Sequence, residues 1–533
     1  MYVHHALAQA LRQRTGTMFG LIGDGNLFMV DSYRRLGGRY VALTHEAATV
    51  TAAGGYHQVS SEVGVATVTH GPALTNTCTA LVDAVRGEVP LVVVAGDTAT
   101  KDHLSLQSIA QREVVLATGA GFEQLRSATT VAEDVATVFR RCVVECRPVV
   151  LNVPVDLQWQ EVEEPSPASP VTYPPVAPDT AALADMVGVL ASAARPLIVA
   201  GRGAVASDGG VAVLALAERV GAVLATTLRA KGLFDGHPSY VGTVGTLADE
   251  RCSAAVQRAD VVCALGASLN EWTTARGSLL AGKRVIHCDV SPASLGRYQQ
   301  ATVNVLGDAR AVAEAAVALL DEAEVPAVTF AEQMRAFEPS PPVEAPAPAD
   351  GRVDFVAALH EVERMVPADR VLVLDGGRFW TETVKTLRVR TPRSYVHTVS
   401  FGSIGLGLGS AIGAAVAGQG RPTLLVAGDG GFMLSGISEL HTAVREGLDL
   451  IVVVMNDGSY GAEHIQFRRR DMDPGLSQFE WPDFAAVATS LGAAGVTVAR
   501  DADFAAAARL IEERDRPVLI DSRIDPDHVP SGR

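Results

Sequence analysis

Short β-branched runs that alternate with alanine-rich segments limit most strongly what this chain can fold into. Such runs, bounded by turn residues, are typical of buried parallel strands. The clearest lie at residues 64–69, 90–95, 148–153, 196–200, 261–265, 284–289, 371–374, 423–427, 450–455 and 517–521. Alanine-rich helical segments lie between them, for example at 437–446 and 504–513. The alternation predicts α/β domains built on doubly wound parallel sheets.

Two proline-rich stretches, at residues 162–178 and 339–348, divide the chain. Proline favours extended linkers over packed structure. The 533 residues also exceed the roughly 250–300 that a single hydrophobic core supports. We therefore expect three domains, at residues 1–160, 180–325 and 350–533.

The charge balance limits the class of partner. Lys and Arg number 44 and Asp and Glu number 60, a net charge of −16, so a nucleic-acid surface is not expected. The first residues lack the layout of a signal peptide, and the uncharged stretches at 63–82 and 402–418 do not resemble membrane-spanning helices. We expect a cytoplasmic protein that binds neither nucleic acid nor membrane.

A glycine-rich turn, Gly428-Asp429-Gly430-Gly431, directly follows the predicted strand 423–427. Glycine lets the backbone approach a phosphate closely, and the amide N–H groups that follow can bind the anion. An aspartate in such a turn repels phosphate unless a cation lies between them. A lone turn of this kind is also an ordinary strand-to-helix connection, so a second motif is needed.

The next predicted strand supplies that motif, because it ends at Asn456-Asp457-Gly458, with the asparagine 27 residues after Asp429. If the two strands are neighbours, Asp429 and Asn456 emerge side by side. The carbonyl oxygen of Gly458 adds a third hard ligand. Mg²⁺ prefers such oxygens and keeps water and diphosphate in its remaining positions.

This pattern resembles the metal–diphosphate motif of thiamine diphosphate-dependent enzymes, in which GDG is followed by an asparagine about two dozen residues later. By that resemblance Asp429, Asn456 and Gly458 bind Mg²⁺, while Gly430 and Gly431 contact the diphosphate. The resemblance also implies the domain order pyrimidine-binding, central and diphosphate-binding.

A glutamate stands where the family places its cofactor-activating carboxylate, after a short strand near residue fifty, in YVALTHEAA (residues 40–48). In the family this carboxylate bonds the pyrimidine ring and favours the form that removes the thiazolium C2 proton. Taken alone, Glu46 is also a plausible first residue of a helix, placed there by the helix dipole. Together with the distant GDG motif, the resemblance assigns the activating role to Glu46.

Further cofactor contacts follow from the same resemblance. The segment VTHGPALTN, which ends at Asn76, is similar to the TxGPGxxN turn of acetolactate synthases. Gly402-Ser403-Ile404-Gly405 resembles the segment whose bulky aliphatic residue bends the cofactor, which assigns that wedge to Ile404, with a buried core isoleucine as the alternative. We also place Gly402 and Tyr460 at the cofactor.

The residues that decide the reaction point in different directions. GLIGDGNL (residues 20–27) is similar to the GLPGDFNL loop of pyruvate decarboxylases, where an aspartate at the position of Asp24 relays protons. Ile22 and Gly25 depart from that loop. The alternative is that Asp24 only forms an Asx turn beside Gly25. His70 resembles the proton-handling histidine of benzoylformate decarboxylase, and a satisfied strand-end histidine is the alternative. Gln107 resembles the glutamine that benzaldehyde lyase and acetolactate synthases place near the substrate.

The resemblance to the acetolactate synthase, pyruvate decarboxylase and benzoylformate decarboxylase group therefore implies an enzyme that acts on 2-oxo acids or aldehydes. Loss of CO₂ leaves an enamine that is either carboligated, as in acetolactate synthases, or protonated to an aldehyde, as in simple decarboxylases. A catalytically silent homologue is a further alternative, but it has no chemical need for Glu46, Asp429 and Asn456 together. The family forms homodimers at least, and commonly homotetramers.

The central block holds one more glycine turn, Gly201-Arg202-Gly203, after the predicted strand 196–200. Some relatives bind FAD or ADP in this region. This chain has no full G-x-G-x-x-G fingerprint, so FAD is possible but not favoured, and a structural domain is expected.

Overall fold

The computed structural model describes residues 1–102, 104–164, 173–338, 353–418 and 420–527. The predicted linker 339–348 lies outside these residues, as does the middle of the predicted linker 162–178. The chain forms two compact units. The first holds Met1–Val171, Ala345–Leu387 and Val396–Arg533, and the second holds Thr172–Glu344 and Arg388–Tyr395.

The first sheet lies in the amino-terminal part of the first unit, and its strands pair in parallel. Its strands are β1 (Thr17–Gly20), β2 (Arg39–Ala42), β3 (Gly64–Val68), β4 (Leu91–Asp97), β5 (Gly121–Gln124) and β6 (Val149–Pro154). The helices around it are α1 (Val3–Arg12), α2 (Leu27–Arg35), α3 (Glu46–Ser60), α4 (Pro72–Thr75), α5 (Cys78–Arg86), α6 (Gln111–Ala117), α7 (Val131–Val144) and α8 (Val155–Gln158).

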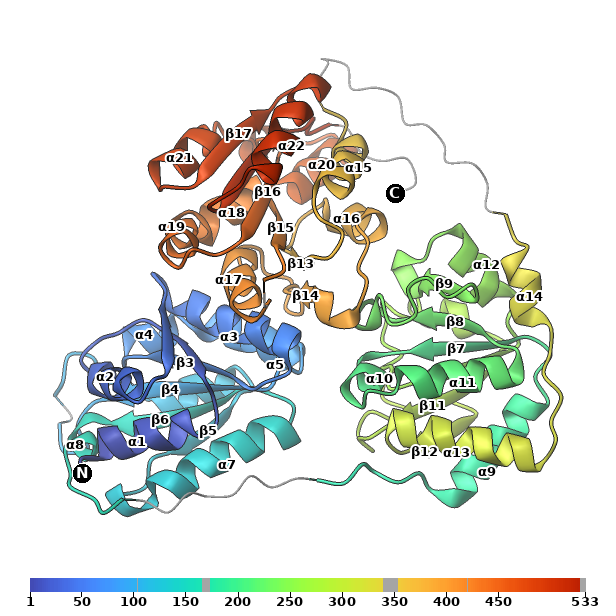
Figure 1. Ribbon diagram of the computed structural model, residues 1–533, viewed down its shortest axis with the longest axis horizontal. Coiled ribbons are helices and arrows are strands. Elements are labelled where there is room, and N and C mark those ends of the chain that lie inside the picture. The colour runs from blue at the N-terminus through green and yellow to red at the C-terminus, as the bar shows by residue number, and fades with distance from the viewer. Residues whose placement is uncertain (103, 165–172, 339–352, 419, 528–533) are drawn as a thin grey trace. The chain divides into compact units, whose positions relative to one another are not determined.

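The third sheet lies in the carboxyl-terminal part of the same unit (Figure 1). Its strands are β13 (Val371–Leu374), β14 (Tyr395–His397), β15 (Thr423–Gly428), β16 (Leu450–Asn456), β17 (Ala494–Val498) and β18 (Val518–Arg523). The helices around it are α15 (Phe355–Met365), α16 (Trp380–Thr386), α17 (Gly407–Ala417), α18 (Asp429–Ser435), α19 (Ile437–Arg445), α20 (Gly461–Arg469), α21 (Phe484–Ser490) and α22 (Phe504–Glu512).

The second unit is built on the central sheet, whose strands also pair in parallel. Its strands are β7 (Pro196–Ala200), β8 (Val223–Thr226), β9 (Tyr240–Thr243), β10 (Val261–Leu265), β11 (Arg284–Asp289) and β12 (Val303–Leu306). Its helices are α9 (Thr180–Ala191), α10 (Arg202–Ala206), α11 (Gly210–Val220), α12 (Glu250–Arg258), α13 (Ala309–Glu322) and α14 (Phe330–Arg335).

Several helix starts have a direct cause in the sequence. Helices α9, α12, α13, α15 and α21 each begin after an aspartate whose carboxylate accepts a backbone N–H from the first turn. Such caps satisfy N–H groups that have no partner inside the helix and typically contribute about 1 kcal/mol each. The capping residues are Asp179, Asp249, Asp308, Asp354 and Asp483.

The strand orders confirm the predicted three doubly wound α/β domains. The first sheet runs β2-β1-β3-β4-β6-β5, and the third runs β14-β13-β15-β16-β18-β17, which is the same pattern. The central sheet runs β12-β11-β10-β7-β8-β9. In each sheet the strand order changes direction at one pair of neighbouring strands, which we call the reversal point: β1 and β3, β7 and β10, and β13 and β15. Ligands of such folds bind beyond the carboxyl ends of these strands. The predicted domain boundaries stay predictions.

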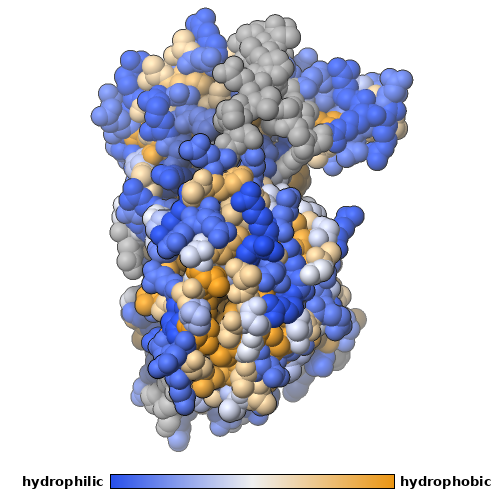
Figure 2. All heavy atoms as spheres, turned by 90° about the vertical axis from the view of Figure 1, so that its right-hand side faces the viewer, coloured by the Kyte–Doolittle hydropathy of each residue, from blue (hydrophilic) through white to orange (hydrophobic). Residues whose placement is uncertain are grey.

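The surface is mixed in character. In the second unit the exposed apolar side chains include Val211, Trp272 and Tyr298, and Figure 2 shows apolar residues gathered between hydrophilic ones on the face in view. Among the helices of the described residues, none combines the length and apolar character that a bilayer crossing needs.

Helices α3 and α17 join the first and third sheets, and they lie side by side in Figure 1. A β-carbon added at Gly413 would overlap the carbonyl oxygen of Ala52, and one added at Gly55 would overlap that of Ser410. The two backbones therefore approach as closely as glycine allows. One apolar core continues across the pair, from Phe19 in β1 to residues of β18.

We expect Gly413→Val to lower the free energy of unfolding by at least about 2 kcal/mol, because the new side chain must push α17 away from α3. Chemical denaturation followed by circular dichroism measures the effect. Gly54→Ala is the matched control, since its β-carbon would meet only Val89 and Leu91, at 3.9 and 4.0 Å. It should leave stability unchanged or raise it by up to about 1 kcal/mol. Equal stability of the valine variant and the wild type would contradict the packing argument.

Candidate functional site

Several predicted residues, together with one aspartate that the sequence interpretation did not single out, lie at the reversal points of the first and third sheets. In the third sheet, Asp375 directly follows β13, and Asp429 directly follows β15. In the first sheet, the loop that contains Asp24 follows β1, and His70 follows β3. Each pair of strands is adjacent, so each group gathers at the sheet edge where α/β folds bind ligands.

Asp429 is almost fully buried, and both of its carboxylate oxygens accept hydrogen bonds. Its Oδ2 atom accepts the indole N–H of Trp481 at 2.8 Å and the N–H of Ser459 at 3.2 Å, and its Oδ1 accepts the N–H of Gly430 at 2.9 Å. Burial and, after it, the charge of Asp457 raise the pKa of Asp429 to about 7. Two carboxyl groups thus lie near each other in a buried place, since the N–H of Ser459 also reaches Asp457, at 2.9 Å.

Asn456 ends β16, which is the neighbour of β15 that the sequence interpretation required. Its side-chain N–H₂ donates to Asp521 Oδ1 at 2.7 Å, while its Oδ1 accepts the N–H of Gly458 at 3.2 Å. Asp521 therefore orients the amide so that its oxygen faces the loop. The carbonyl of Gly458 accepts the N–H of Phe479 at 2.8 Å, which leaves one lone pair for a ligand.

These donors fit a hard divalent cation. A buried carboxylate, an amide oxygen and a carbonyl oxygen at one sheet edge are the ligand types that Mg²⁺ takes, with water and phosphate oxygens completing its shell. Among the described residues no cluster of three or more His, Cys, Asp or Glu side chains is placed to hold a metal. The predicted set has one carboxylate, so it is not a cluster of that kind.

An ion pair that the sequence interpretation missed supports the same loop. Arg378 donates to Asp457 at 2.6 Å, and both side chains are buried. The other oxygen of Asp457 accepts the N–H and the O–H of Ser459, at 2.9 and 2.7 Å. Arg378 also donates to the carbonyl of Asp525 at 2.8 Å. The loop after β16 is therefore tied to the loop after β13 and to the segment after β18.

The glycines of the turn are closed by other site residues. A β-carbon at Gly430 would lie 2.6 Å from the ring of Tyr460, and one at Gly431 would lie 3.1 Å from Asp375 and 3.6 Å from Ile404. Gly402 adopts a φ of +81°, where glycine is favoured, and nothing lies within 4 Å of its β-carbon position. Tyr460 and Ile404 thus flank the glycine turn; their contact with a cofactor stays a prediction.

Asp375 was not among the predicted residues, although the Asp-Gly-Gly after its strand has the same local pattern as the GDG turn. It accepts the N–H of Gly376 at 2.7 Å, and both of its oxygens lie 3.0 Å from the N–H of Gly405. Burial raises the pKa of Asp375 to about 6, against the lowering effect of these backbone N–H groups. Asp375 therefore holds the chain between Ile404 and α17.

On the first sheet, Glu46 is the first residue of α3 and is partly exposed. Asn76, another predicted cofactor contact, donates to Glu46 Oε2 at 3.0 Å. These two residues therefore form one group. Within the described residues Glu46 makes no hydrogen bond to Asp429, Asn456 or Ile404, which belong to the third sheet.

The residues predicted to handle protons are brought together. Thr69 Oγ1 donates to Asp24 at 3.3 Å and lies 3.2 Å from His70 Nδ1. His70 is buried, and its Nδ1 lies 2.6 Å from the place where a side chain at Gly25 would begin. The histidine thus explains why glycine replaces the phenylalanine of the decarboxylase loop. The backbone of Gln107 lies against Gly71, the residue after His70, since a β-carbon at Gly71 would meet it at 2.5 Å.

In the central sheet the glycine turn packs against protein. A β-carbon at Gly203 would lie 2.7 Å from Gly266, and one at Gly201 would overlap the carbonyl oxygen of Gly266. Close contact between the loops after β7 and β10 therefore accounts for both glycines without a ligand.

Three family models match the chain in order. They are the N-terminal TPP binding domain (residues 1–117), the central domain (183–316) and the C-terminal TPP binding domain (375–522) of thiamine pyrophosphate enzymes. The acetolactate synthase of Mycobacterium bovis is 27% identical over 506 residues, which cover 91% of this chain and 81% of that protein. The sulfoacetaldehyde acetyltransferase of Castellaniella defragrans is 29% identical over 522 residues, 91% of this chain and 86% of that protein.

Among solved structures, the chain is similar to a thiamine diphosphate-dependent 4-hydroxybenzoylformate decarboxylase of Rhodococcus jostii RHA1. The TM-score is 0.83 over 98% of this chain and 99% of that one, at 22% sequence identity. This likeness extends over all three sheets and concerns the fold.

The buried Asp375 generates a prediction on pH. Its folded-state pKa of about 6 exceeds the roughly 3.9 of an unfolded aspartate, so its contribution to stability is present below pH 4 and is lost as pH rises through 6. Between pH 5 and pH 7.5 we expect the wild type to lose about 1 kcal/mol of unfolding free energy relative to Asp375→Asn. Urea denaturation at several pH values measures the difference.

Asp185→Asn is the control for this series, because Asp185 is exposed on α9. Its unfolding free energy should follow that of the wild type at every pH. A constant difference between the wild type and Asp375→Asn from pH 5 to pH 7.5 would show that Asp375 does not titrate in this range.

Proposed function

Because the chain belongs to the thiamine pyrophosphate enzyme family, we propose that it uses thiamine diphosphate and Mg²⁺ to cleave and form C–C bonds on 2-oxo acids, in the manner of acetolactate synthases. That it is a thiamine diphosphate-dependent enzyme of the acetolactate synthase and decarboxylase family follows from the matched domains and relatives. The observation that carries the finer proposal is the buried oxygen set of Asp429 and Asn456 at the ends of neighbouring strands.

The bound cofactor supplies a nucleophilic carbon that attacks a carbonyl group and stabilises the charge left when CO₂ departs. The chain would hold its diphosphate through Mg²⁺ on Asp429, Asn456 and Gly458, with the N–H groups of Gly430 and Gly431 nearby. Trp481 and Asp521 keep the first two ligands in place, at 2.8 and 2.7 Å. Tyr460, Gly402 and Ile404 would flank the cofactor.

On the first sheet, Glu46 would hydrogen-bond the pyrimidine ring and favour removal of the C2 proton. Asn76 already donates to one oxygen of Glu46, which leaves the other for the ring. The two groups of residues lie on different sheets, and the family builds one site from two chains. We therefore propose a homodimer or homotetramer, and we also propose that it is cytoplasmic.

A simple 2-oxo acid decarboxylase is the second candidate, and one observation favours it. The hydroxyl group of Thr69 lies 3.3 Å from Asp24 Oδ1 and 3.2 Å from His70 Nδ1, and so links the two residues that we propose to handle protons. Formation of an aldehyde needs such a proton donor. Relatives that the sequence matches include acetolactate synthases and sulfoacetaldehyde acetyltransferases, which favours transfer to a second substrate. The identity of the products separates the two candidates.

We expect Asp429→Asn to lose Mg²⁺-dependent retention of thiamine diphosphate. The variant keeps the size of the side chain but removes its charge, and loss of even an outer-shell partner weakens metal sites by about 10- to 100-fold. Equilibrium dialysis of thiamine diphosphate at increasing Mg²⁺ concentrations measures the shift.

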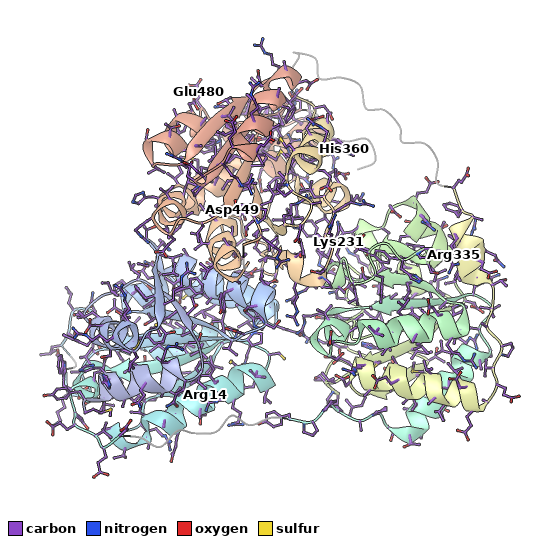
Figure 3. The ribbon with its side chains drawn as sticks, viewed as in Figure 1. Arg14, Lys231, Arg335, His360, Asp449 and Glu480 are labelled. Carbon is purple, nitrogen blue, oxygen red and sulfur yellow. The ribbon has the colours of Figure 1, made fainter. Side chains whose placement is uncertain are left out.

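Asp449→Asn is the matched control for the metal experiment. Asp449, labelled in Figure 3, precedes β16 and pairs with Arg514 at 2.6 Å, so it lies at the end of the strand opposite Asn456. It should retain the cofactor like the wild type. The metal assignment fails if Asp429→Asn retains the cofactor at the same Mg²⁺ concentration as this control.

A panel of 2-oxo acids, each with and without an aldehyde or second 2-oxo acid, tests the reaction. Acyloin or acetolactate-type products support the proposed carboligase, and free aldehyde supports the simple decarboxylase. Where aldehyde is released, we expect Asp24→Asn to lower that release by at least about tenfold while changing carboligation less. Equal loss of both products in Asp24→Asn would show that this aspartate does not relay protons to the aldehyde-forming step.

A further inference from the structure

A glutamate that belongs to neither predicted group lies fully buried where the third sheet meets the first. Glu439 stands in the first turn of α19, and none of its surface is exposed. Residues of this type are rarely buried unless their oxygens are well supplied with donors. Its partners are therefore the key to its role.

The donors come mainly from the segment just before α3. Glu439 Oε1 accepts the N–H of Thr44 at 2.9 Å, the O–H of Thr44 at 2.8 Å and the N–H of His45 at 3.0 Å. Its Oε2 accepts the O–H of Thr442, one turn further along α19, at 2.8 Å. One carboxyl group thus binds two consecutive backbone amides that lie 395 and 394 residues away in the sequence.

Two further residues of α19 contact the segment between β2 and α3. The guanidinium of Arg445 donates to the carbonyl of Ala42, at the end of β2. The hydroxyl groups of Ser438 and Thr44 are 3.0 Å apart. The helix therefore contacts the connection from β2 to α3 from Ser438 and Glu439 in its first turn to Arg445 in its last.

Stability alone does not require this carboxyl group. Thr44 and His45 are both exposed, so water could serve their amide groups if Glu439 were absent. Burying a carboxylate is costly even where its oxygens accept hydrogen bonds, and those bonds largely offset that cost. The effect of Glu439 is instead geometric, since it fixes the backbone of two residues.

Those two residues lead directly into Glu46. His45 is the N-cap of α3, with φ −140° and ψ 139°, and its Nδ1 accepts the N–H of Ala47 at 3.1 Å. Glu46 follows as the first helical residue. The direction in which the Glu46 side chain leaves the helix therefore depends on the backbone that Glu439 holds.

We propose that Glu439 is a positioning residue that fixes the Thr44–His45 backbone and thereby aims Glu46 at the cofactor. The inference rests on the proposed function in one respect, the activating role of Glu46. Glu439 itself touches neither cofactor nor substrate, and it acts by accepting hydrogen bonds rather than by moving a proton.

Four variants separate this role from others. Glu439→Met fills the same volume without an acceptor, and Glu439→Gln keeps an oxygen for Thr44 and His45 while its N–H₂ can donate to Thr442. Thr442→Val removes only the bond to Oε2 and is the matched control on the same helix. Glu46→Gln removes the proposed activating carboxylate and leaves Glu439 in place.

The first measurement is amide hydrogen–deuterium exchange of the peptide that contains Thr44 and His45, in the protein without cofactor. We expect exchange of these two amides to rise by at least about tenfold in Glu439→Met and to stay within about threefold of the wild type in the other three variants. Unchanged exchange in a folded Glu439→Met protein overturns the proposal. If that variant does not fold, rapid exchange in Glu439→Gln with a normal unfolding midpoint overturns it equally.

The second measurement is C2 proton exchange of bound thiamine diphosphate, followed by NMR. We expect a decrease of about 10- to 100-fold in Glu439→Met, since displacements near 1 Å have effects of this size, and values within about threefold of the wild type in Glu439→Gln and Thr442→Val. Equal loss in the methionine and glutamine variants refutes positioning by hydrogen-bond acceptance. Glu46→Gln decides the separate question: unchanged C2 exchange there refutes the activating role of Glu46, whereas the amide exchange still tests what Glu439 holds.

Discussion

The close packing of α3 against α17 is the constraint on which the rest of the first unit depends. Glycine at residues 55 and 413 brings the two backbones so near that no side chain fits between them. The apolar core then runs without a break from the first sheet to the third. α3 begins at Glu46, and α17 begins three residues after Ile404. The contact between the two helices therefore also fixes the positions of these two predicted cofactor residues. Packing and chemistry are therefore coupled at the same pair of helices.

Four buried carboxyl groups lie in the same unit. Each is at most 3% exposed, and they belong to Asp375, Asp429, Glu439 and Asp521. Three of them are supplied by identifiable donors: the backbone at Gly405 for Asp375, the Thr44–His45 segment for Glu439 and the amide of Asn456 for Asp521. Asp429 also has donors, but it faces a second carboxylate. It is the one of the four that we propose as a metal ligand, and the other three serve as acceptors that hold neighbouring segments in place.

Much of this could be predicted from local sequence. Strands buried on both faces, such as β7, β10 and β16, show as continuous apolar runs. Because the carboxyl ends of neighbouring parallel strands lie at the same side of a sheet, Asp429 and Asn456 could be placed together. Edge strands such as β17, where four of five residues are only partly buried, carry no such run and were missed. Glu439 could not be found at all, because its partners lie almost 400 residues away and a glutamate in a helical segment is normally exposed.

The central sheet shows why strand order and glycine are not sufficient to locate a ligand. Its order, with β10 beside β7 at the reversal point, is that of many dinucleotide-binding domains, and a glycine turn follows β7. The backbone at Gly266 fills the space beside that turn. At the third sheet the space beside Gly430 and Gly431 is instead closed by Tyr460, Ile404 and Asp375, side chains that can flank a ligand. What stands opposite a glycine, rather than the glycine itself, separates the turn that we propose to bind diphosphate from the one that only packs.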